Sequence, residues 1–372
     1  MSRLIHRGAA LLAALALLVT VAAPAAASAS GYRTESRFIH VVDGPANDQH
    51  IAIDTTLYVP VGATAAHPAP AVIGAHGFGE NKGALAGVAE FLADRGYAVL
   101  LYSARGFGRS GGKISLDSPS YDVKDVEQLA SWLGTQPEIE RDSKGPVVGM
   151  FGDSYGGGVT LLAAAYDPAI RVAIPILTWN SLISSFLPND VAPSNPQPGV
   201  FKQGWASVFL GGGGGGFSGG GGATPPPTSA CPGFVPGICE AYVATAGGGQ
   251  PTPQALATLA MSSPGSVIGN IKVPTLLLQG EADTLFNLNE AEATEAGVRA
   301  NGAPARMVWV PGGHSNLGAI LSGSTASVLK AAIDSWLDRW LKGNRSVITG
   351  GDTWYDPATG RYLPFSSRTT TS

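Results

Sequence analysis

Short apolar runs that alternate with helical periods are the feature of this chain that most constrains its fold. Each run is rich in Val, Ile or Leu and lacks polar-apolar alternation, which is typical of strands covered on both faces. The runs are PAVIGAH (70–76), YAVLLYS (97–103), PVVGMFGD (146–153), RVAIPIL (171–177), VPTLLLQG (273–280) and RMVWVPG (306–312). Helical periods lie between or after them, at 84–96, 122–136, 158–167, 288–302 and 325–343. Because strand and helix alternate, we predict an α/β fold with a mostly parallel central sheet and helices on both faces.

Two further strands are expected before this alternating region, at 37–43 and 50–60, joined by a turn at PAND. The alternation of strands and helices stops between residues 183 and 268, where the sequence predicts no convincing strand. This interval holds a glycine run at 211–222 and the triple proline at 225–227. Since the sheet resumes at 273, we predict an inserted lid at 183–268 between core segments 30–182 and 269–343, followed by a carboxyl-terminal tail at 344–372.

Within the lid, the glycine run itself is expected to be a flexible low-complexity spacer. The flanking segments PGVFKQGWASVFL (198–210) and ICEAYVATA (238–246) are expected to form packed helices over the mouth of a site. Asp190, Lys202 and Glu240 are the only charged residues from 183 to 267. An uncharged lid of this kind suggests apolar acyl or alkyl groups as substrates.

Residues 1–29 indicate a secretory signal peptide. Basic residues precede the apolar stretch AALLAALALLVTVAA, and PAAASAS offers small residues for cleavage near Ala27 or Ala29. A membrane anchor is the alternative, but the apolar stretch is short for a spanning helix of about 20 residues. We therefore expect an exported, extracellular mature chain without stable membrane insertion.

The chain has a formal net charge of −4 and only 13% charged residues, so it offers no strongly basic surface for binding nucleic acid.

Cys231 and Cys239 are the two cysteines, and they lie close together in a proline-rich stretch. In an oxidising compartment such a pair is expected to form a disulfide, worth about 2.5 kcal/mol in the chain-entropy model. A metal site would need further soft ligands and no histidine is nearby, so we expect no metal there.

Three serines stand at the centre of a G-x-S-x-G spacing, and their surroundings distinguish them. A nucleophile at this spacing needs a strand before it and a helix after it, so that the turn lifts the hydroxyl above the sheet. Ser154 in GDSYGG has both. Ser218 lies within the glycine run, and Ser110 in GRSGG is followed by GGKISLDSPS, which does not predict a helix. The same stretch, RGFGRSG, matches the dinucleotide pattern G-x-G-x-x-G, but that interpretation requires a helix to begin at once.

A serine nucleophile needs a base held by an acid, and on such a sheet the chain order is Ser, then Asp or Glu, then His. His314 is the only histidine after Ser154. It lies just past the last predicted strand, where a loop can carry it over the sheet edge. We therefore predict His314 as the base.

Asp283, directly after the strand VPTLLLQG, is the expected acid, and Glu281 is its rival. Asp167 ends the helix after the serine, and Asp190 belongs to the lid, so neither is favoured. For the oxyanion we predict the backbone N–H groups of Phe78, in the glycine-rich loop AHGFGENKG, and of Tyr155. His76 precedes the serine in the chain order and is expected to shape that loop.

The motifs HGFG, RGFGRSGG, GDSYGG, GEADTLFNLNEA and GGHS occur in an order that resembles the α/β-hydrolase fold, from about residue 37 to 343. Within that fold, the chain looks most like the X-prolyl dipeptidyl-peptidase and bacterial cocaine-esterase family, because of its RGxGxSGG loop together with G-x-S-Y-G-G. The resemblance implies Ser154 as nucleophile, Asp283 as acid and His314 as base.

The chain departs from the family in three respects. Ser103 stands where many members have an Asp two residues before the RG of the loop. One helix and a short tail end the chain, where family enzymes often add a β-sandwich. The HGFG loop stands where members tend to use a Tyr side chain in the oxyanion hole.

We therefore expect a secreted serine hydrolase that cleaves an ester or related acyl bond in a small-molecule or short peptide substrate, with no metal or organic cofactor. The alternatives are an X-Pro dipeptidyl aminopeptidase and a non-catalytic secreted binding protein on a hydrolase scaffold. A dipeptidyl peptidase must hold a free substrate amine, normally with carboxylates, and the lid contains just two acidic residues.

Overall fold

The computed structural model describes residues 31–188, 199–210, 231, 233–248, 250–316 and 323–365. These residues belong to one compact unit, Gly31–Ser372. The expected signal peptide at 1–29 lies outside the described residues, as do Asp190, Ser218 and the glycine run at 211–222.

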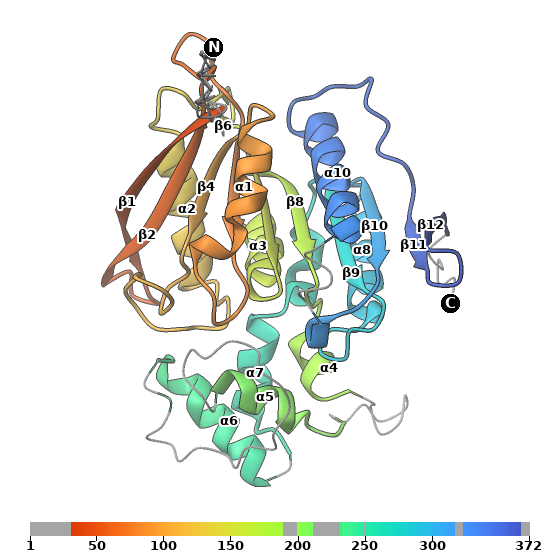
Figure 1. The fold of residues 1–372 in the computed structure, drawn as a ribbon. Coiled ribbons are helices and arrows are strands. Elements are labelled where there is room, and N and C mark those ends of the chain that lie inside the picture. The colour runs from red at the N-terminus through yellow and green to blue at the C-terminus, as the bar shows by residue number, and fades with distance from the viewer. Residues whose placement is uncertain are drawn as a thin grey trace, which may run out of the picture. The chain divides into compact units, whose positions relative to one another are not determined.

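Ten strands form one mixed sheet in the order β1-β2-β4-β3-β7-β8-β9-β10-β11-β12 (Figure 1). The seven strands from β4 to β11 in this order are all parallel to their neighbours within that group. Strands β1, β2 and β12 run antiparallel to the strands they join. The strands are β1 Tyr32–Asp43, β2 Gln49–Pro60, β3 Ala71–Ala75, β4 Ala98–Tyr102, β7 Val148–Asp153, β8 Ile170–Ile176, β9 Thr275–Gly280, β10 Ala305–Val310, β11 Thr353–Asp356 and β12 Arg361–Pro364. A separate two-stranded hairpin pairs β5 Arg141–Asp142 with β6 Gly145–Pro146.

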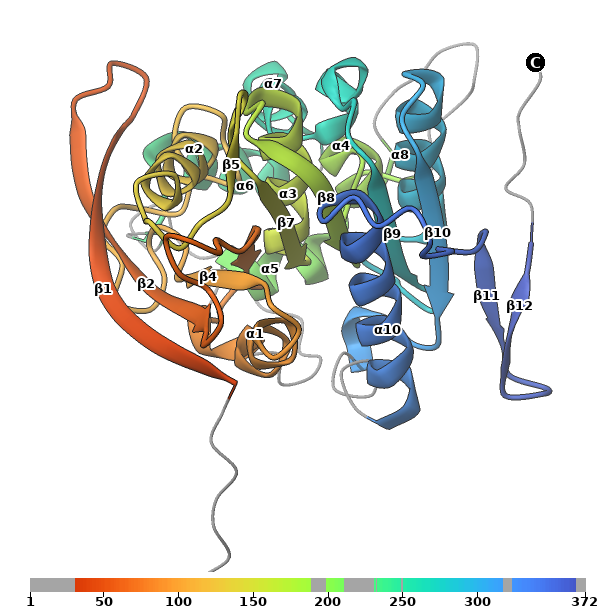
Figure 2. The same cartoon turned by 90° about the horizontal axis from the view of Figure 1, so that it is seen from above.

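Helices cover both faces of the sheet, as predicted. Figure 2 shows α1 and α10 on one face and α2, α3 and α8 on the other. The helices of the core are α1 Ala86–Ala93, α2 Asp122–Leu133, α3 Tyr155–Tyr166, α8 Leu288–Ala300 and α10 Gly323–Trp340, with short 3-10 turns η1 Lys82–Leu85 and η4 His314–Asn316. The α/β fold with a mostly parallel sheet, predicted from the alternating pattern, is confirmed.

Two apolar cores result from this layering, because successive residues of a strand point to opposite faces. In β7, Met150 belongs to the core under α2 and α3, and the next residue, Phe151, belongs to the core under α1 and α10. Strands β3, β4 and β7 are buried along their whole length. Burial on both faces explains why these strands appear in the sequence as apolar runs without alternation.

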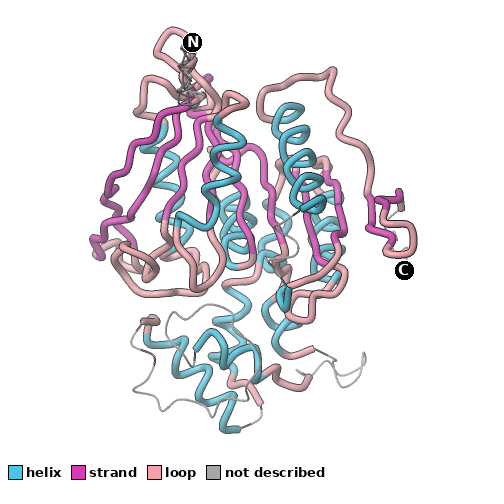
Figure 3. Tube along the Cα trace, in the orientation of Figure 1, coloured by secondary structure: helices cyan, strands magenta, loops and turns pink. Residues whose placement is uncertain are grey.

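The segment between β8 and β9 folds as helices at the end of the sheet where the parallel strands terminate (Figures 1 and 3). We call residues 182–270 the insertion. Its described elements are α4 Leu182–Phe186, α5 Gln203–Leu210, α6 Pro236–Gly248, α7 Pro253–Met261 and the 3-10 helix η3 Pro264–Asn270. Helices α5 and α6 occupy the two segments in which the sequence predicted packed helix.

The carboxyl-terminal tail contains a strand hairpin that the sequence analysis did not predict. Strand β11 joins the sheet through a single paired position, Val308 with Thr353, and β12 pairs with β11. Asp352 anchors the hairpin by accepting hydrogen bonds from Met307 N at 3.0 Å and from the Arg299 guanidinium at 3.0 Å. These partners are distant in sequence, so local patterning could not reveal them.

None of the helices within the described ranges is both long and apolar enough to cross a bilayer.

Candidate active site

Ser154 occupies the turn between β7 and α3, with φ 51° and ψ −111°. A non-glycine residue in this left-handed region is strained, and the surrounding backbone holds it there. Ser154 N donates to Ile176 O at 2.8 Å, and Thr178 Oγ1 donates to Ser154 O at 2.9 Å. A Cβ on Gly156 would overlap the carbonyl oxygen of Ala75. The glycine in this position is therefore required by the close approach of β3.

His314 and Asp283 lie beside this serine in a continuous chain of hydrogen bonds. His314 Nε2 is 2.8 Å from Ser154 Oγ, and His314 Nδ1 is 2.5 Å from Asp283 Oδ2. The three residues are 3–6% exposed. A carboxylate only accepts hydrogen bonds, so Nδ1 carries the imidazole proton and Nε2 presents its lone pair to the serine hydroxyl. The structure thus brings together three residues that are up to 160 positions apart in the chain.

The loop after β9 fixes the carboxylate of Asp283. Its Oδ1 accepts hydrogen bonds from Leu285 N and Phe286 N, both at 2.9 Å. From the insertion, Lys202 Nζ donates to the carbonyl oxygens of Thr284 at 2.8 Å and Leu285 at 3.0 Å. From the sequence, Lys202 was identified only as one of the few charged residues of the predicted lid. Its contact with the loop of Asp283 depends on tertiary structure alone.

Glu281, the rival acid, faces another part of the molecule. Its Oε1 accepts a hydrogen bond from Tyr355 N in β11 at 2.8 Å. Asp167 accepts one from Ala169 N at 2.8 Å, at the end of α3. Of the acidic candidates within the described residues, Asp283 is therefore the one whose carboxylate contacts His314. Asp190 lies outside those residues.

Ser110, another serine at the G-x-S-x-G spacing, makes hydrogen bonds that hold a loop in place. Its hydroxyl donates to Ser103 O at 2.6 Å and accepts from Asp54 N at 2.8 Å, which ties the RGFGRSGG loop to β2 and β4. Three glycines of this loop adopt positive φ: Gly106 at 76°, Gly108 at 57° and Gly112 at 80°. The next helix, α2, begins only at Asp122, so the dinucleotide interpretation of this loop has no structural support.

The two residues predicted as oxyanion donors lie at the cavity beside Ser154. Phe78 follows β3 in the HGFG loop, and Tyr155 is the first residue of α3, where a helical N–H has no intrahelical acceptor. Both residues line the same cavity as Ser154. The Phe78 ring packs edge-on against the Tyr155 ring, with centroids 5.8 Å apart. An oxyanion bound here would meet the positive end of α3.

His76 holds the HGFG loop. Ala104 N donates to His76 Nε2 at 2.9 Å, so Nε2 is an acceptor and Nδ1 carries the proton that it donates to Gly77 O at 2.7 Å. Burial lowers the pKa of His76 to about 4, which keeps the ring neutral in this arrangement.

A pair of carboxylates flanks the same loop. Glu80 Oε2 accepts from Gly77 N at 3.1 Å, and Asp153 Oδ2 would lie 2.8 Å from a Cβ on Gly77. Burial, and then the nearby charge of Glu80, raises the pKa of Asp153 to about 7. Burial therefore favours the protonated form of the residue before the serine, a property that its position in the sequence did not indicate.

The side chain of Tyr155 is anchored in a buried acidic network. Its hydroxyl accepts from Asp117 N at 3.2 Å and donates to Asp122 Oδ1 at 3.3 Å. Burial, offset in part by Arg105, raises the pKa of Asp122 to about 6. Arg105 itself is fully enclosed and donates to Asp43 at 3.1 Å. This network fixes the orientation of the first turn of α3.

A deep cavity of about 840 Å³, including its open mouth, begins at Ser154 and extends into the insertion. Six phenylalanine side chains contribute to its wall, together with residues from α4, α5, α6 and α7. None of the described residues that line it carries a charge. The cavity is therefore suited to an apolar group.

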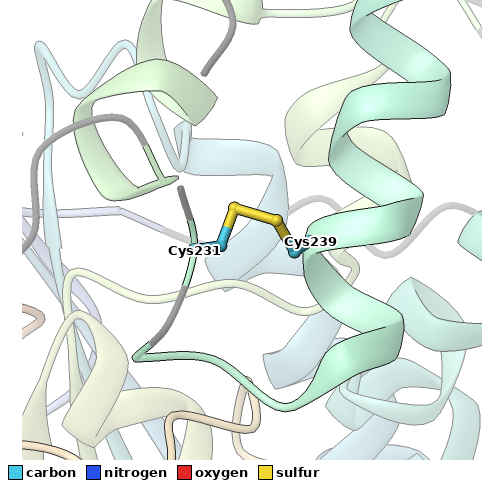
Figure 4. Close-up of a disulfide and its surroundings, with 2 residues drawn as sticks. All are labelled: Cys231 and Cys239. Atoms are coloured by element: carbon cyan, nitrogen blue, oxygen red, sulfur yellow. A yellow bond between two sulfur atoms is a disulfide. The ribbon is translucent and has the colours of Figure 1, made fainter. Parts of the chain in front are cut away.

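Cys231 and Cys239 form a disulfide that closes a short loop of the insertion (Figure 4). Phe234 lies within this loop and stacks on Phe78, with ring centroids 6.0 Å apart. The loop is also bound to the core, since Ile114 N donates to Gly233 O at 2.8 Å. The disulfide therefore stabilises a wall of the cavity next to the HGFG loop.

Among the described residues, no group of three or more His, Cys, Asp or Glu side chains is arranged to hold a metal ion.

Comparisons with known proteins agree with this architecture. The family model of the X-Pro dipeptidyl-peptidases (S15 family) matches residues 48–201. A thiohydrolase of Aspergillus aculeatus is 29% identical over 109 residues, which cover 29% of this chain and 33% of that protein. The chain spans about a third of the length of the curated relatives it matches.

Solved structures share the fold over a larger part of the chain. An esterase of Pyrococcus furiosus has a TM-score of 0.51 and 15% identity, covering 82% of this chain and 93% of the esterase. An acylaminoacyl peptidase of Pyrococcus horikoshii has a TM-score of 0.54 and 15% identity, covering 83% of this chain and 42% of the peptidase. Together with the family model, these likenesses support a hydrolase of the serine esterase or peptidase type. The chain thus has the α/β-hydrolase fold, and over residues 48–201 it is similar to the X-Pro dipeptidyl-peptidase family, as predicted.

Proposed function

We propose that the protein is a secreted serine hydrolase that cleaves an ester or related acyl bond through an acyl-enzyme on Ser154. The observation that carries this proposal is the hydrogen-bonded series Ser154 Oγ, His314 Nε2, His314 Nδ1 and Asp283 Oδ2, with distances of 2.8 Å and 2.5 Å. Secretion is supported by the composition of residues 1–29 and by the disulfide, which suits an oxidising compartment.

In the proposed reaction, Ser154 Oγ attacks the substrate carbonyl carbon while His314 Nε2 takes the hydroxyl proton. The carbonyl oxygen becomes an oxyanion, which the N–H groups of Phe78 and Tyr155 stabilise. His314 then donates its proton to the departing alcohol oxygen, leaving the acyl group on Ser154. Water attacks this ester with His314 as base, which releases the acid and restores the serine. Asp283 keeps the imidazole in the required tautomer throughout.

The insertion acts as the lid over this site in our proposal. Its described helices α4–α7 supply most of the cavity wall, and Lys202 joins it to the loop of Asp283.

The test is the Ser154→Ala variant, assayed with a short-chain nitrophenyl ester. Turnover should fall by about 10⁴-fold or more, because the nucleophile is removed while binding and the oxyanion donors remain. Ser110→Ala is the matched control, and it should retain turnover because its hydroxyl bonds only to structural groups. Retained turnover in Ser154→Ala, with folding intact, would overturn the proposal.

An X-Pro dipeptidyl aminopeptidase is the second candidate, favoured by the family match over residues 48–201. Such an enzyme must bind a free substrate amine. Among the described residues, the cavity wall offers no carboxylate, and Glu240 of the insertion is exposed on α6. We therefore favour the esterase. Assay of an Ala-Pro anilide beside the nitrophenyl ester distinguishes the two, and a clear preference for the anilide would reverse our choice.

A further inference from the structure

The cavity above Ser154 is formed by two parts of the chain, the core and the insertion. Near the serine it is bounded by Phe78, Tyr155 and Phe286 of the core, and beyond them by side chains of the insertion. Figure 1 shows α6 on the side of the insertion away from the sheet, and Ala241 of α6 lines the cavity. The cavity therefore continues from the reacting serine into the helical insertion.

Polar groups in the cavity wall are already bonded within the protein. Thr245 Oγ1 donates to Ala241 O at 2.7 Å, and Thr258 Oγ1 donates to Gln254 O at 3.0 Å. The indole of Trp179 donates to Ser262 O at 2.8 Å.

The two tyrosine hydroxyls of the wall are bonded in the same way. Ser207 Oγ donates to Gln203 O at 2.7 Å, so the 3.0 Å contact between Ser207 and Tyr242 has the tyrosine as donor. Tyr155 accepts from the backbone and donates to Asp122. A ligand group deep in this cavity would find few hydrogen-bond partners, so an apolar group suits it.

The position of the cavity relative to His314 indicates which half of an ester it holds. His314 Nε2 must protonate the departing alcohol oxygen, so the alcohol lies next to the imidazole. Phe78 and Tyr155, the proposed oxyanion donors, line the cavity directly. His314 meets the cavity through Phe286, whose ring packs edge-on against the imidazole with centroids 5.0 Å apart. The cavity therefore extends from the carbonyl side of the serine, where the acyl group remains after the alcohol has left.

The insertion that forms this wall is joined to the core by several polar contacts. Glu290 of α8 accepts from Asn180 N and Ser181 N, both at 2.8 Å, at the start of the insertion. Lys202 binds two carbonyl oxygens of the loop of Asp283. A wall held in this way is preformed, and it can select ligands by length.

We propose that this cavity is the acyl-binding site and that the enzyme prefers esters of apolar acyl chains well beyond acetyl. This inference rests on the proposed serine-hydrolase function. Ala241 is a specificity-determining residue in this assignment, because a larger side chain there would fill the cavity at α6 without touching the reacting groups.

The experiment compares nitrophenyl esters whose acyl chain lengthens from acetate to octanoate while the leaving group stays the same. Each ester is assayed below its aggregation concentration. Each methylene buried in the cavity should raise kcat/KM by up to about fourfold. A free octanoate ester already buries part of its chain in water, so the gain per methylene is smaller than this limit. We therefore expect kcat/KM to rise at least about 100-fold from acetate to octanoate. A second series keeps acetate and lengthens the alcohol from ethyl to octyl, and it should change kcat/KM by less than about fivefold.

The Ala241→Phe variant tests the location of the chain. We expect octanoate turnover, as kcat/KM, to fall at least about tenfold, while acetate turnover stays within about twofold of wild type. Ala244→Phe is the matched control, because Ala244 lies one turn further along α6 and is exposed. It should leave both substrates unchanged. Since acetate turnover in Ala241→Phe itself reports an intact site, misfolding would be recognised.

Each contrary outcome identifies which idea fails. Ser154-dependent turnover of acetate with a flat acyl series would overturn the acyl-site inference and leave the hydrolase proposal in place. A strong length preference in the alcohol series instead would overturn the assignment of the cavity to the acyl half. Absence of Ser154-dependent turnover with every ester would refute the hydrolase proposal itself.

Discussion

Replacing Asp283 with Asn tests the proposed role of this carboxylate with almost no change in shape. In the structure, Oδ1 accepts two backbone N–H groups at 2.9 Å, while Oδ2 faces His314 Nδ1 at 2.5 Å. In Asp283→Asn, the amide oxygen should keep the two backbone donors, because turning the amide over would leave both unsatisfied at about 1–3 kcal/mol each. The amide NH₂ then points at Nδ1.

This orientation forces the imidazole into the wrong tautomer. Nδ1 must accept from the amide, so Nε2 carries the proton and can no longer accept the proton of Ser154 Oγ. In a serine protease the corresponding change lowers kcat by about 10⁴-fold, or about 5.5 kcal/mol of transition-state stabilisation. We expect a loss of 10³-fold to 10⁴-fold here, with KM for a short-chain nitrophenyl ester nearly unchanged.

Glu281→Gln is the matched control, since Glu281 bonds to Tyr355 N in β11 rather than to His314. It should retain kcat. Stopped assays at pH 7.5, with circular dichroism to verify folding, provide the measurement. The reasoning is refuted if Asp283→Asn keeps more than about a tenth of wild-type kcat, or if Glu281→Gln loses as much as Asp283→Asn.

Three further predictions concern stability. Ser110→Ala removes the bonds to Ser103 O and Asp54 N and should lower the free energy of unfolding by about 1–3 kcal/mol in urea titrations, and a change below about 0.3 kcal/mol would contradict the structural role. The raised pKa of Asp153, about 7, means that the folded protein holds a proton that the unfolded chain loses above pH 4, so stability should fall as pH rises from 4 to 7. Asp153→Asn cannot ionise and should gain stability relative to wild type across that window, whereas parallel urea-derived profiles would oppose this assignment. The double variant Cys231→Ala/Cys239→Ala should lower the free energy of unfolding by up to about 2.5 kcal/mol. The loss should appear mainly as faster hydrogen exchange in residues 231–248, and unchanged exchange there would show that the disulfide does not stabilise this wall.

The sequence predicted the core of the fold because local signals and tertiary structure agree there. Strands such as β3 and β7 are buried on both faces, so their apolar composition alone indicates their position. The grouping of Ser154, His314 and Asp283 followed from chain order and from where parallel strands end. That three-residue assignment remains a prediction about catalysis, although the distances now show that the side chains meet.

Other features depend on contacts that no local pattern contains. Strand β11 is short and meets β10 at one paired position, so its existence depends on Asp352 and Glu281. Asp122 and Asp125 look like ordinary acidic residues of a helix first turn, yet they are buried near Arg105. The cavity of the insertion arises from four separate helices and could not be located from composition.

Covalent trapping of the nucleophile tests the central claim most directly. The protein is treated with an alkyl fluorophosphonate, digested, and the modified peptide sequenced by mass spectrometry. Our account predicts a single stoichiometric adduct on Ser154, lost in His314→Ala because the hydroxyl is then no longer activated. An adduct on Ser110 or another serine, or no adduct on the folded protein, would contradict it.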